Sequence, residues 1–188
     1  QAKTFERLVI GQIKETQGKT EGLTPIEHYL KVVSDKTGSL IATSARFGAL
    51  LSGANSETVE TLTKFGEKIG IAFQIADDLL DVVSDSTASG KTPGTDLKEG
   101  IPTLVTLYVI AGNAPQDQEL IKKLSGPIPE SDLKNVIMQL RSHKALDQVR
   151  EYLSNIAKQA EALLTDLPEG SAKEALRNVI YVLINRST

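Results

Sequence analysis

The sequence predicts an all-α protein built as a helical bundle. Apolar residues recur at spacings of three and four along most of the 188-residue chain, which is the period of an amphipathic helix. The strict apolar–polar alternation that would predict strands is almost absent. Helix start signals and Gly or Pro breaks divide the periodic stretches, so we expect two long central helices followed by shorter ones.

The N-terminal half contains the clearest boundary signals. Residues 1–17 are typical of the end of a helix, which Gly18 closes because glycine adopts the left-handed conformation of a C-cap. The Thr-Pro-Ile-Glu segment at residues 24–27 predicts an N-cap, a proline in the first turn and a capping box. We expect one long helix from there to Gly53 and a second, with a Ser cap, over residues 56–83.

Residues 84–100 interrupt the helical pattern. The segment is rich in Ser, Thr, Gly and Pro and holds one large apolar residue, Leu97, so we expect an exposed, mobile loop. Beyond it the spacing predicts helices over 101–111, 116–124, 130–140, 145–164 and 171–185. No internal repeat or domain linker is visible, so residues 1–188 are expected to form a single α-helical domain.

The composition excludes several classes of protein. Cys is absent, which rules out disulfides, thiolate metal sites and a cysteine nucleophile. With 21 Lys+Arg against 24 Asp+Glu there is no basic excess, so nucleic-acid binding has little electrostatic support. The apolar stretches fall short of the ~20 residues that cross a bilayer, and no signal peptide is visible. We therefore expect a cytoplasmic protein with no transmembrane segment.

The start of the sequence is unusual for a translation product. It begins at Gln1, and its one methionine is Met138. A helical pattern is already established over residues 4–10 without a convincing N-cap. We therefore expect the sequence to be the C-terminal part of a longer protein, whose activity depends on residues outside it.

The candidate site lies within residues 69–83. On a helical wheel this stretch is apolar over most of its circumference, and its polar residues share one arc about 100° wide. These residues are Gln74, Asp77, Asp78 and Asp81. A helix that is apolar on most sides is buried, and three buried carboxylates repel one another and lose hydration. Either their pKa values rise, or they face a wet cavity that holds a hard cation such as Mg²⁺. The alternative is a solvated acidic patch at a helix end.

Several further motifs accompany this acidic one in a fixed order. In chain order they read Gly11-Gln12, Lys36-Thr37-Gly38-Ser39-Leu40, Phe73-Gln74-Ile75-Ala76-Asp77-Asp78-Leu79-Leu80-Asp81, Ser89-Gly90-Lys91-Thr92-Pro93-Gly94-Thr95-Asp96-Leu97 and Glu99-Gly100-Ile101-Pro102-Thr103-Leu104. Together they resemble the trans-polyprenyl diphosphate synthase family, that of the farnesyl, geranylgeranyl and longer-chain synthases. The third motif is similar to the second aspartate-rich motif of that family. The resemblance implies a helical bundle of the isoprenoid synthase type, of which this sequence is the C-terminal portion.

The resemblance also implies a prenyltransferase reaction. In this family an allylic diphosphate ionises, isopentenyl diphosphate attacks the cation, and a proton is lost. Diphosphate leaves only when its charge is neutralised. The resemblance therefore implies Mg²⁺ as cofactor, held by the metal ligands Asp77, Asp78 and Asp81.

Four further residues are implied as catalytic. Lys36 and Lys91 would add positive charge beside the diphosphate, with Lys91 carried over the substrate by the loop. Thr37 and Gln74 would contact the substrate or stabilise the allylic cation by their dipoles. Apart from the resemblance, the two lysines are typical of solvated side chains, and Gln74 fits either a core amide or a ligand.

One feature of the family is missing from the sequence. Its first aspartate-rich motif, with the paired arginines that follow, does not occur, so we expect that the N-terminal helices carrying it are lacking and that this chain alone is inactive. The alternative is a non-catalytic helical subunit of a heteromeric prenyl diphosphate synthase, although such a subunit would be free to lose Lys36 or Lys91. A terpene cyclase would need a second metal motif of the Asn-Ser-Glu type, which is not found around residues 136–161.

Some residues outside these motifs carry weaker expectations. The family usually dimerises through helices of this region, so we expect a homodimer. Apolar residues that fit either the core or a dimer surface are Leu8, Ile10, Val32, Val33, Leu40 and Phe47. His28 and His143 are expected on the surface, and Glu67 is a candidate for tuning the aspartates. Asp85 and Asp96 suit turn formation or a supporting role in metal binding.

Overall fold

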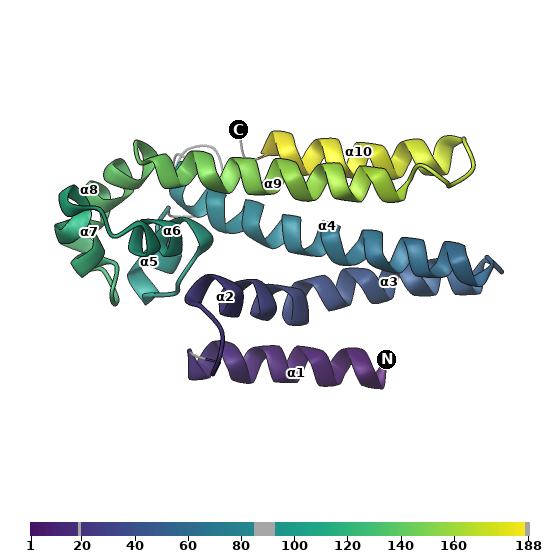
Figure 1. The fold of residues 1–188 in the computed structure, drawn as a ribbon, viewed down its shortest axis with the longest axis horizontal. Coiled ribbons are helices and arrows are strands. Elements are labelled where there is room, and N and C mark those ends of the chain that lie inside the picture. The colour runs from purple at the N-terminus through teal and green to yellow at the C-terminus, as the bar shows by residue number, and fades with distance from the viewer. Residues whose placement is uncertain (19, 85–92, 187–188) are drawn as a thin grey trace. The chain divides into compact units, whose positions relative to one another are not determined.

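The computed structural model describes residues 1–18, 20–84 and 93–186. Within these ranges the chain forms helices and connecting segments and no strand, so the all-α prediction is confirmed (Figure 1). The helices belong to two compact units. The first contains residues 1–74 and 153–186, and the second contains residues 75–152. The expectation of a single domain stays a prediction.

The first unit begins with a helix that lies against two others. α1 (Ala2–Gln17) ends at Gly18, whose φ of 71° is the left-handed C-cap conformation. α2 (Pro25–Val33) begins with the predicted capping box, in which the Thr24 N–H donates to the Glu27 carboxylate at 2.8 Å and the Glu27 N–H donates to the Thr24 hydroxyl at 3.2 Å. α1 contacts α2 and α3 (Ser39–Leu51).

A π-helical turn lies where the sequence predicted one continuous helix. This turn, η1 (Ser34–Gly38), joins α2 to α3 and also contacts α1. A π turn is wider than an α turn and occurs most often as a single turn inside a helix, frequently at a functional site. Apolar spacing predicts that a helix exists but does not reveal one widened turn within it, so η1 could not be predicted from the sequence.

α4 (Ser56–Val83) has the bounds that the sequence predicted. Its N-terminus is capped by Asn55 rather than by the expected Ser, because Asn55 Oδ1 accepts the Thr58 N–H at 2.8 Å. In the first unit α4 approaches η1 very closely. A Cβ atom at Gly70 would lie 2.7 Å from the Cα of Gly38, so the absence of a side chain at Gly70 is what permits this packing.

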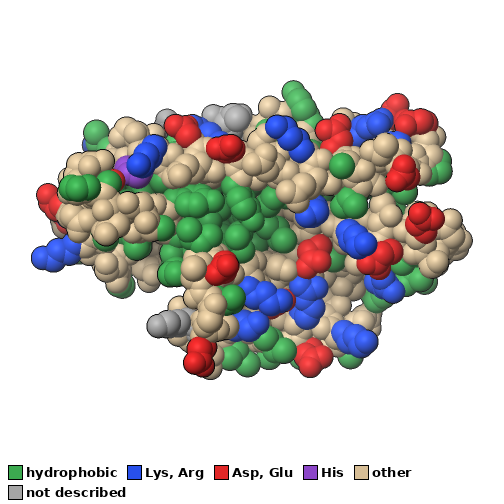
Figure 2. Space-filling view, in the orientation of Figure 1, with side chains coloured by type: hydrophobic (Ala, Val, Ile, Leu, Met, Phe, Trp, Pro, Cys, Tyr) green, Lys and Arg blue, Asp and Glu red, His purple; other side chains and the backbone are tan. Residues whose placement is uncertain are grey.

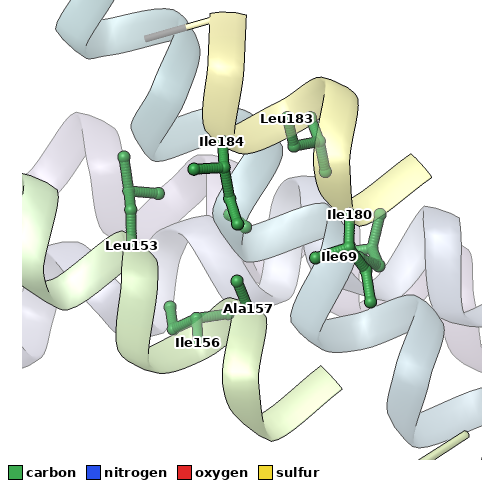
Figure 3. A pocket seen from close by; sticks show the side chains of 8 residues that line it. Ile69, Leu153, Ile156, Ala157, Ile180, Leu183 and Ile184 are labelled. Atoms are coloured by element: carbon green, nitrogen blue, oxygen red, sulfur yellow. The ribbon is translucent and has the colours of Figure 1, made fainter. Parts of the chain in front are cut away.

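The last two helices complete the first unit. The end of α9 (Lys144–Leu163) and α10 (Ser171–Arg186) are joined by a turn that Lys173 closes. Lys173 is 3% exposed, and its ammonium donates to two carbonyl oxygens and to the Glu169 carboxylate. A small apolar pocket lies between α4, α9 and α10; Ile69, Ile156 and Ile184 are among the side chains that line it (Figure 3).

The second unit holds the end of α4, the start of α9 and several short helices. They are α5 (Thr95–Glu99), α6 (Leu104–Gly112), the 3₁₀ helix η2 (Pro115–Asp117), α7 (Gln118–Lys123) and α8 (Glu130–Arg141). α6 to α10 begin and end within a few residues of the predicted bounds. None of the helices in the described ranges combines the length and apolarity that crossing a bilayer requires.

The loop prediction was wrong for residues 95–99. They form α5, and residues 85–92 lie outside the described residues. Two glycines in the left-handed conformation flank α5, Gly94 with φ of 82° and Gly100 with φ of 69°. The Gly, Ser, Thr and Pro content of the segment concealed a helix of little more than one turn, whose Leu97 is buried.

Candidate functional site

Four aspartates of the second unit lie near the C-terminal end of α4. Asp77, Asp78 and Asp81 are on α4, Asp96 is on α5, and all four are half-buried. Burial and then the negative charges of Asp78, Asp81, Glu99 and Asp77 raise the pKa of Asp96 from 3.8 to about 7. The three aspartates that the sequence placed on one arc of a helix therefore act together on a fourth carboxylate.

The N-terminus of α5 holds the Asp81 side chain. Asp81 Oδ1 accepts the Thr95 N–H at 3.1 Å, and Oδ2 accepts the Asp96 N–H at 3.0 Å. The Gly94 N–H donates to the Asp81 carbonyl oxygen at 2.8 Å. The first N–H groups of a helix have no acceptor inside the helix, so the Asp81 carboxylate serves as the acceptor for two of them. The orientation of this carboxylate is thereby fixed, and each oxygen keeps a second lone pair for a further ligand.

Arg141 of α8 binds the C-terminal end of α4. Its Nε donates to the carbonyl oxygen of Val82 at 2.9 Å, and its Nη2 donates to that of Ser84 at 2.7 Å. A cation there satisfies unpaired carbonyls and complements the helix dipole. Arg141 could not be predicted from the sequence, because its two partners lie 59 and 57 positions earlier in the chain and one arginine on an amphipathic helix is no local signal.

The face of α4 beneath the aspartates is deeply buried. Ile75 and Leu79 are 0% exposed and Val82 is 1% exposed, as the sequence predicted. Phe73, which belongs to the same apolar stretch, is 40% exposed, so the expectation that residues 69–83 are buried on their apolar sides was wrong for this residue. The apolar packing on one side lowers the local dielectric, which strengthens the interactions among the aspartates.

The aspartates fit a hard cation by their chemistry but do not form a closed metal site. Among the described residues, no group of three or more His, Cys, Asp or Glu side chains lies close enough together to hold a metal ion. Carboxylate oxygens suit Mg²⁺, which usually binds one or two carboxylates, keeps several waters and takes phosphate oxygens as further ligands. A ligand shell completed by water and phosphate is therefore the arrangement that fits these residues.

In the first unit, η1 and α4 bring two predicted site residues together. The Thr37 hydroxyl donates to Gln74 Oε1 at 2.9 Å, and both side chains are half-buried. Gln74 precedes Asp77 by three residues, about one turn of α4. The hydrogen bond fixes the orientation of the Gln74 amide.

Lys36 lies beside Thr37 on η1 and is paired with α1. Its Nζ lies 2.5 Å from Glu15 Oε2, and Glu15 also accepts a hydrogen bond from Gln12 at 2.9 Å. The Gly-Gln motif and the Lys-Thr motif, distant in sequence, thus meet through Glu15. The other predicted lysine, Lys91, lies outside the described residues, as does Asp85.

A buried carboxylate that the sequence analysis did not single out lies on the same π-helical turn. Asp35 is 3% exposed. Its Oδ1 accepts from Arg7 Nε and from Lys31 Nζ, each at 3.2 Å, and its Oδ2 accepts from Lys14 Nζ at 3.4 Å. Burial disfavours the charged form, but the hydrogen bonds and charges of Lys31 and Arg7 outweigh it and lower the pKa of Asp35 below its ordinary value. We call Asp35 and its three cations the Asp35 network.

Arg7 extends this network to α4. Its Nη2 donates to Glu67 Oε1 at 2.8 Å and to Ser34 Oγ at 3.1 Å, and Ser34 Oγ donates to the same Glu67 oxygen at 2.8 Å. Against the effect of burial, these contacts lower the pKa of Glu67. Glu67, a candidate for tuning the aspartates, is thus bound by Arg7 and Ser34. Figure 2 shows Lys and Arg side chains gathered with acidic ones over α1 to α3.

The surface prediction was wrong for His143. Its side chain is 13% exposed, and its Nε2 lies 3.1 Å from Asp117 Oδ2. Its Nδ1 accepts the Ala145 N–H at 3.0 Å near the start of α9, so His143 acts as a cap. His28 is half-buried and hydrogen-bonds with the Thr20 hydroxyl at 2.8 Å.

Comparison with known proteins identifies the family. Residues 1–157 match the family described as polyprenyl synthetase. The nonaprenyl diphosphate synthase of Mycobacterium tuberculosis is 40% identical over 186 residues, which are 98% of this chain and 56% of that protein. The decaprenyl-diphosphate synthase of Dictyostelium discoideum is 32% identical over 91% of this chain and 37% of that protein.

A solved structure shares the fold. The geranylgeranyl pyrophosphate synthase of Corynebacterium glutamicum, complexed with calcium and isoprenyl diphosphate, superposes with a TM-score of 0.90 at 36% identity, over 99% of this chain and 58% of that one. The helical bundle of the isoprenoid synthase type is thereby confirmed. The chain spans about half the length of the first curated relatives it matches. By its sequence and its fold, the chain belongs to the polyprenyl synthetase family, that of the trans-prenyl diphosphate synthases.

Proposed function

We propose that this chain supplies the second aspartate-rich motif of a prenyltransferase that condenses isopentenyl diphosphate with an allylic diphosphate into a trans-polyprenyl diphosphate. The observation that carries this proposal is the cluster of four half-buried aspartates, Asp77, Asp78, Asp81 and Asp96, in the second unit. Like charges held together on a buried helix are costly and are typical of functional sites. Family membership supports the reaction class.

In this proposal Asp77, Asp78 and Asp81 are the ligands of Mg²⁺. The ion, when bound, would supply the positive charge that lets diphosphate leave. Two N–H groups of α5 donate hydrogen bonds to the Asp81 carboxylate and so orient it for this task. Asp96, whose pKa is raised to about 7, adds negative charge at the same place when it is ionised, and a bound divalent cation would favour that ionised form. The buried face of α4 behind them excludes water from one side of the site.

Residues of the first unit would act on the substrate. We assign Lys36 to the diphosphate, for which it would exchange its present partner, Glu15. We assign Thr37 and Gln74, already hydrogen-bonded to each other, to the allylic end, where an oriented hydroxyl and amide stabilise positive charge by their dipoles. Lys91 is assigned the second positive charge beside the diphosphate.

Thermal unfolding with Mg²⁺ and inorganic pyrophosphate tests the site directly. A ligand at about 100 times its Kd stabilises the folded state by about 2.7 kcal/mol, so the two together should raise Tm by several degrees. Asp77→Asn or Asp81→Asn should abolish this shift. Asp147→Asn is the matched control, because this aspartate of the second unit has a side chain that is 79% exposed. No shift in the unmodified protein would contradict the proposal.

Turnover distinguishes the enzyme from the non-catalytic subunit. We expect no product from the 188-residue chain alone, because it holds one acidic motif and the proposed chemistry uses two. Incorporation of labelled isopentenyl diphosphate by this chain alone would contradict that expectation. Pyrophosphate binding without turnover, even when a partner supplying the other acidic motif is added, would favour the subunit.

We also propose that the chain assembles as a homodimer through its exposed apolar side chains. Val32 and Val33 are 7% and 5% exposed, so of the residues considered for this surface these two belong to the core. Ile10 and Leu40 are 40% and 44% exposed, and Phe5 on α1 is 69% exposed. Sedimentation velocity should show a dimer that Leu40→Glu converts to a monomer; a monomer without the substitution would contradict the proposal.

A further inference from the structure

The Asp35 network joins three elements of the first unit at one carboxylate. Arg7 and Lys14 come from α1 and Lys31 from α2, whereas Asp35 itself lies on η1. On the same turn, the Asp35 carbonyl oxygen accepts the Ser39 hydroxyl at 2.6 Å. The side chain and the backbone of Asp35 are therefore both engaged, directly before the two site residues of η1.

The backbone of η1 is closely packed on two sides. On the α1 side, a Cβ at Gly11 would lie 3.0 Å from Asp35 Cβ and 3.0 Å from Lys36 Cγ. On the α4 side, a Cβ at Gly70 would lie 2.7 Å from Gly38 Cα. The two helices contact this turn at near-minimum distance, so a small change in its conformation would displace Lys36 and Thr37.

Stability alone does not account for a charge at this position. Replacing a buried ion-pair network by apolar residues of similar volume is often neutral or stabilising. What a charged network provides is direction, because each hydrogen bond requires a particular orientation of donor and acceptor. The π conformation is rare, so a directional anchor at the second residue of η1 would favour it over a regular α turn.

We infer that Asp35 is a positioning residue, whose bonds to Arg7, Lys14 and Lys31 hold η1 in the π conformation that brings Thr37 to Gln74. Any effect of Asp35 on catalysis rests on the proposed function, because it would act through Lys36 and Thr37. The effect of Asp35 on the conformation of η1 is independent of that function, and it is read from one hydrogen bond, which Thr37 Oγ1 donates to Gln74 Oε1.

The test compares Asp35→Asn with Glu60→Gln by NMR. Glu60 belongs to the same unit and also contacts two cations, Arg46 and Lys64, but its side chain is 56% exposed. Asp35→Asn should shift the Gln74 side-chain amide resonances and speed amide exchange of residues 34–38 at least about fivefold relative to residues 59–63. Glu60→Gln should change neither. Unchanged Gln74 resonances in folded Asp35→Asn would overturn the inference.

A double-mutant cycle separates positioning from general support of the fold. Thr37→Val removes the hydroxyl that binds Gln74. If Asp35 acts through that bond, Asp35→Asn should cause little further shift of the Gln74 amide in the Thr37→Val background. Fully additive shifts would show that Asp35 supports the fold without positioning Thr37, and would overturn the inference.

A second pair of variants covers the case in which Asp35→Asn does not fold. Lys31→Met and Lys64→Met each remove a lysine from an ion pair spaced four residues apart on a helix, with Asp35 and Glu60 respectively. The two lysines are 48% and 60% exposed. Lys31→Met should shift the Gln74 side-chain amide resonances, and Lys64→Met should not; equal responses to the two variants would overturn the inference.

Inorganic pyrophosphate separates failure of this inference from failure of the proposed function. If the proposed function holds, Asp35→Asn should weaken Mg²⁺-dependent pyrophosphate binding by about five- to tenfold, measured by calorimetry, because Lys36 shifts. If pyrophosphate does not bind the unmodified protein, the function fails while the Gln74 readout still tests Asp35. If it binds equally well to both proteins with Gln74 unmoved, the inference alone fails.

Discussion

Asp35 and Asp96 are two carboxylates in opposite electrostatic surroundings. Asp35 is 3% exposed and contacts three cations, of which Lys31 and Arg7 lower its pKa despite the opposing effect of burial. Asp96 is only half-buried, yet burial and four neighbouring carboxylates raise its pKa to about 7. Burial raises both pKa values, so the comparison teaches that the sign of the neighbouring charges decides in which direction the pKa of each carboxylate finally moves. Asp35, whose charge is compensated by neighbouring cations, stabilises the fold, whereas Asp96, which is clustered with other carboxylates, fits a cation.

The largest change in the free energy of unfolding should come from removing the Asp35 carboxylate. Asp35→Ala leaves three cations close together without their common partner, so we expect a loss of about 2–4 kcal/mol in the free energy of unfolding. Urea denaturation followed by circular dichroism measures it. Glu60→Ala, in an exposed pair, should change stability by less than about 0.5 kcal/mol. Similar losses in both variants would remove the distinction between the two kinds of ion pair.

Acid should weaken the Asp35 network next. The pKa values of Asp35 and Glu67 are lowered on folding, so their contribution is present above the ordinary values of 3.8 and 4.5 and is lost as the pH falls below them. The facing charges are those of Arg7, Lys14 and Lys31. We expect a loss of about 1 kcal/mol from Asp35 between pH 5 and pH 3, after allowance for solvent screening.

The control for this pH profile is the Asp35→Asn variant. Its stability should fall less steeply over the same pH range, because the group that takes up the proton is gone. Thermal unfolding at half-unit steps of pH measures both profiles. Parallel profiles would show that Asp35 does not contribute to acid denaturation.

Removing the charge of Asp96 should change the free energy of unfolding in the opposite direction to removing that of Asp35. Asp96→Asn eliminates a charge that is costly to bury beside Asp77, Asp78 and Asp81, so without divalent cations it should stabilise the protein. We expect about 1 kcal/mol, reduced from the full electrostatic value by solvent screening, or a rise in Tm of about 2–4 °C. A fall in Tm at neutral pH would mean that Asp96 makes a stabilising contact as an anion.

The smallest expected effect is a difference in salt dependence between the aspartate cluster around Asp96 and the Asp35 network. Raising NaCl from 50 mM to 500 mM shortens the screening length to a few ångströms. The gain from Asp96→Asn should then fall by a few tenths of a kcal/mol, because the half-buried aspartates are accessible to ions. The loss from Asp35→Ala should change less. Denaturant midpoints at both salt concentrations, with sulfate excluded, measure the difference.

Prediction from the sequence succeeded where structure depends on neighbours along the chain. The capping box at Thr24 and the C-cap at Gly18 were predicted because their signals lie within a few residues of one another. The arc of Asp77, Asp78 and Asp81 follows from helical spacing alone. Their metal-binding role, and the roles of Lys36, Thr37, Gln74 and Lys91, stay predictions.

The features that were missed depend on distant residues. Asp35 meets Arg7 and Lys14, 28 and 21 positions away, and Arg141 meets the end of α4 across more than fifty positions. Neither contact leaves a periodic or compositional trace. The short helix α5 was missed because its glycines favour a loop, whereas burial of Leu97 favours the helix.

By itself the sequence determined the longer helices, the caps at Gly18 and Thr24, the acidic arc on α4 and the family resemblance, since these follow from residue spacing and backbone preference. Only the tertiary structure decided which charges are compensated, and where a helix widens into a π turn. The physical reason is that Coulomb interactions and close packing depend on distances through space, which spacing along the chain does not specify.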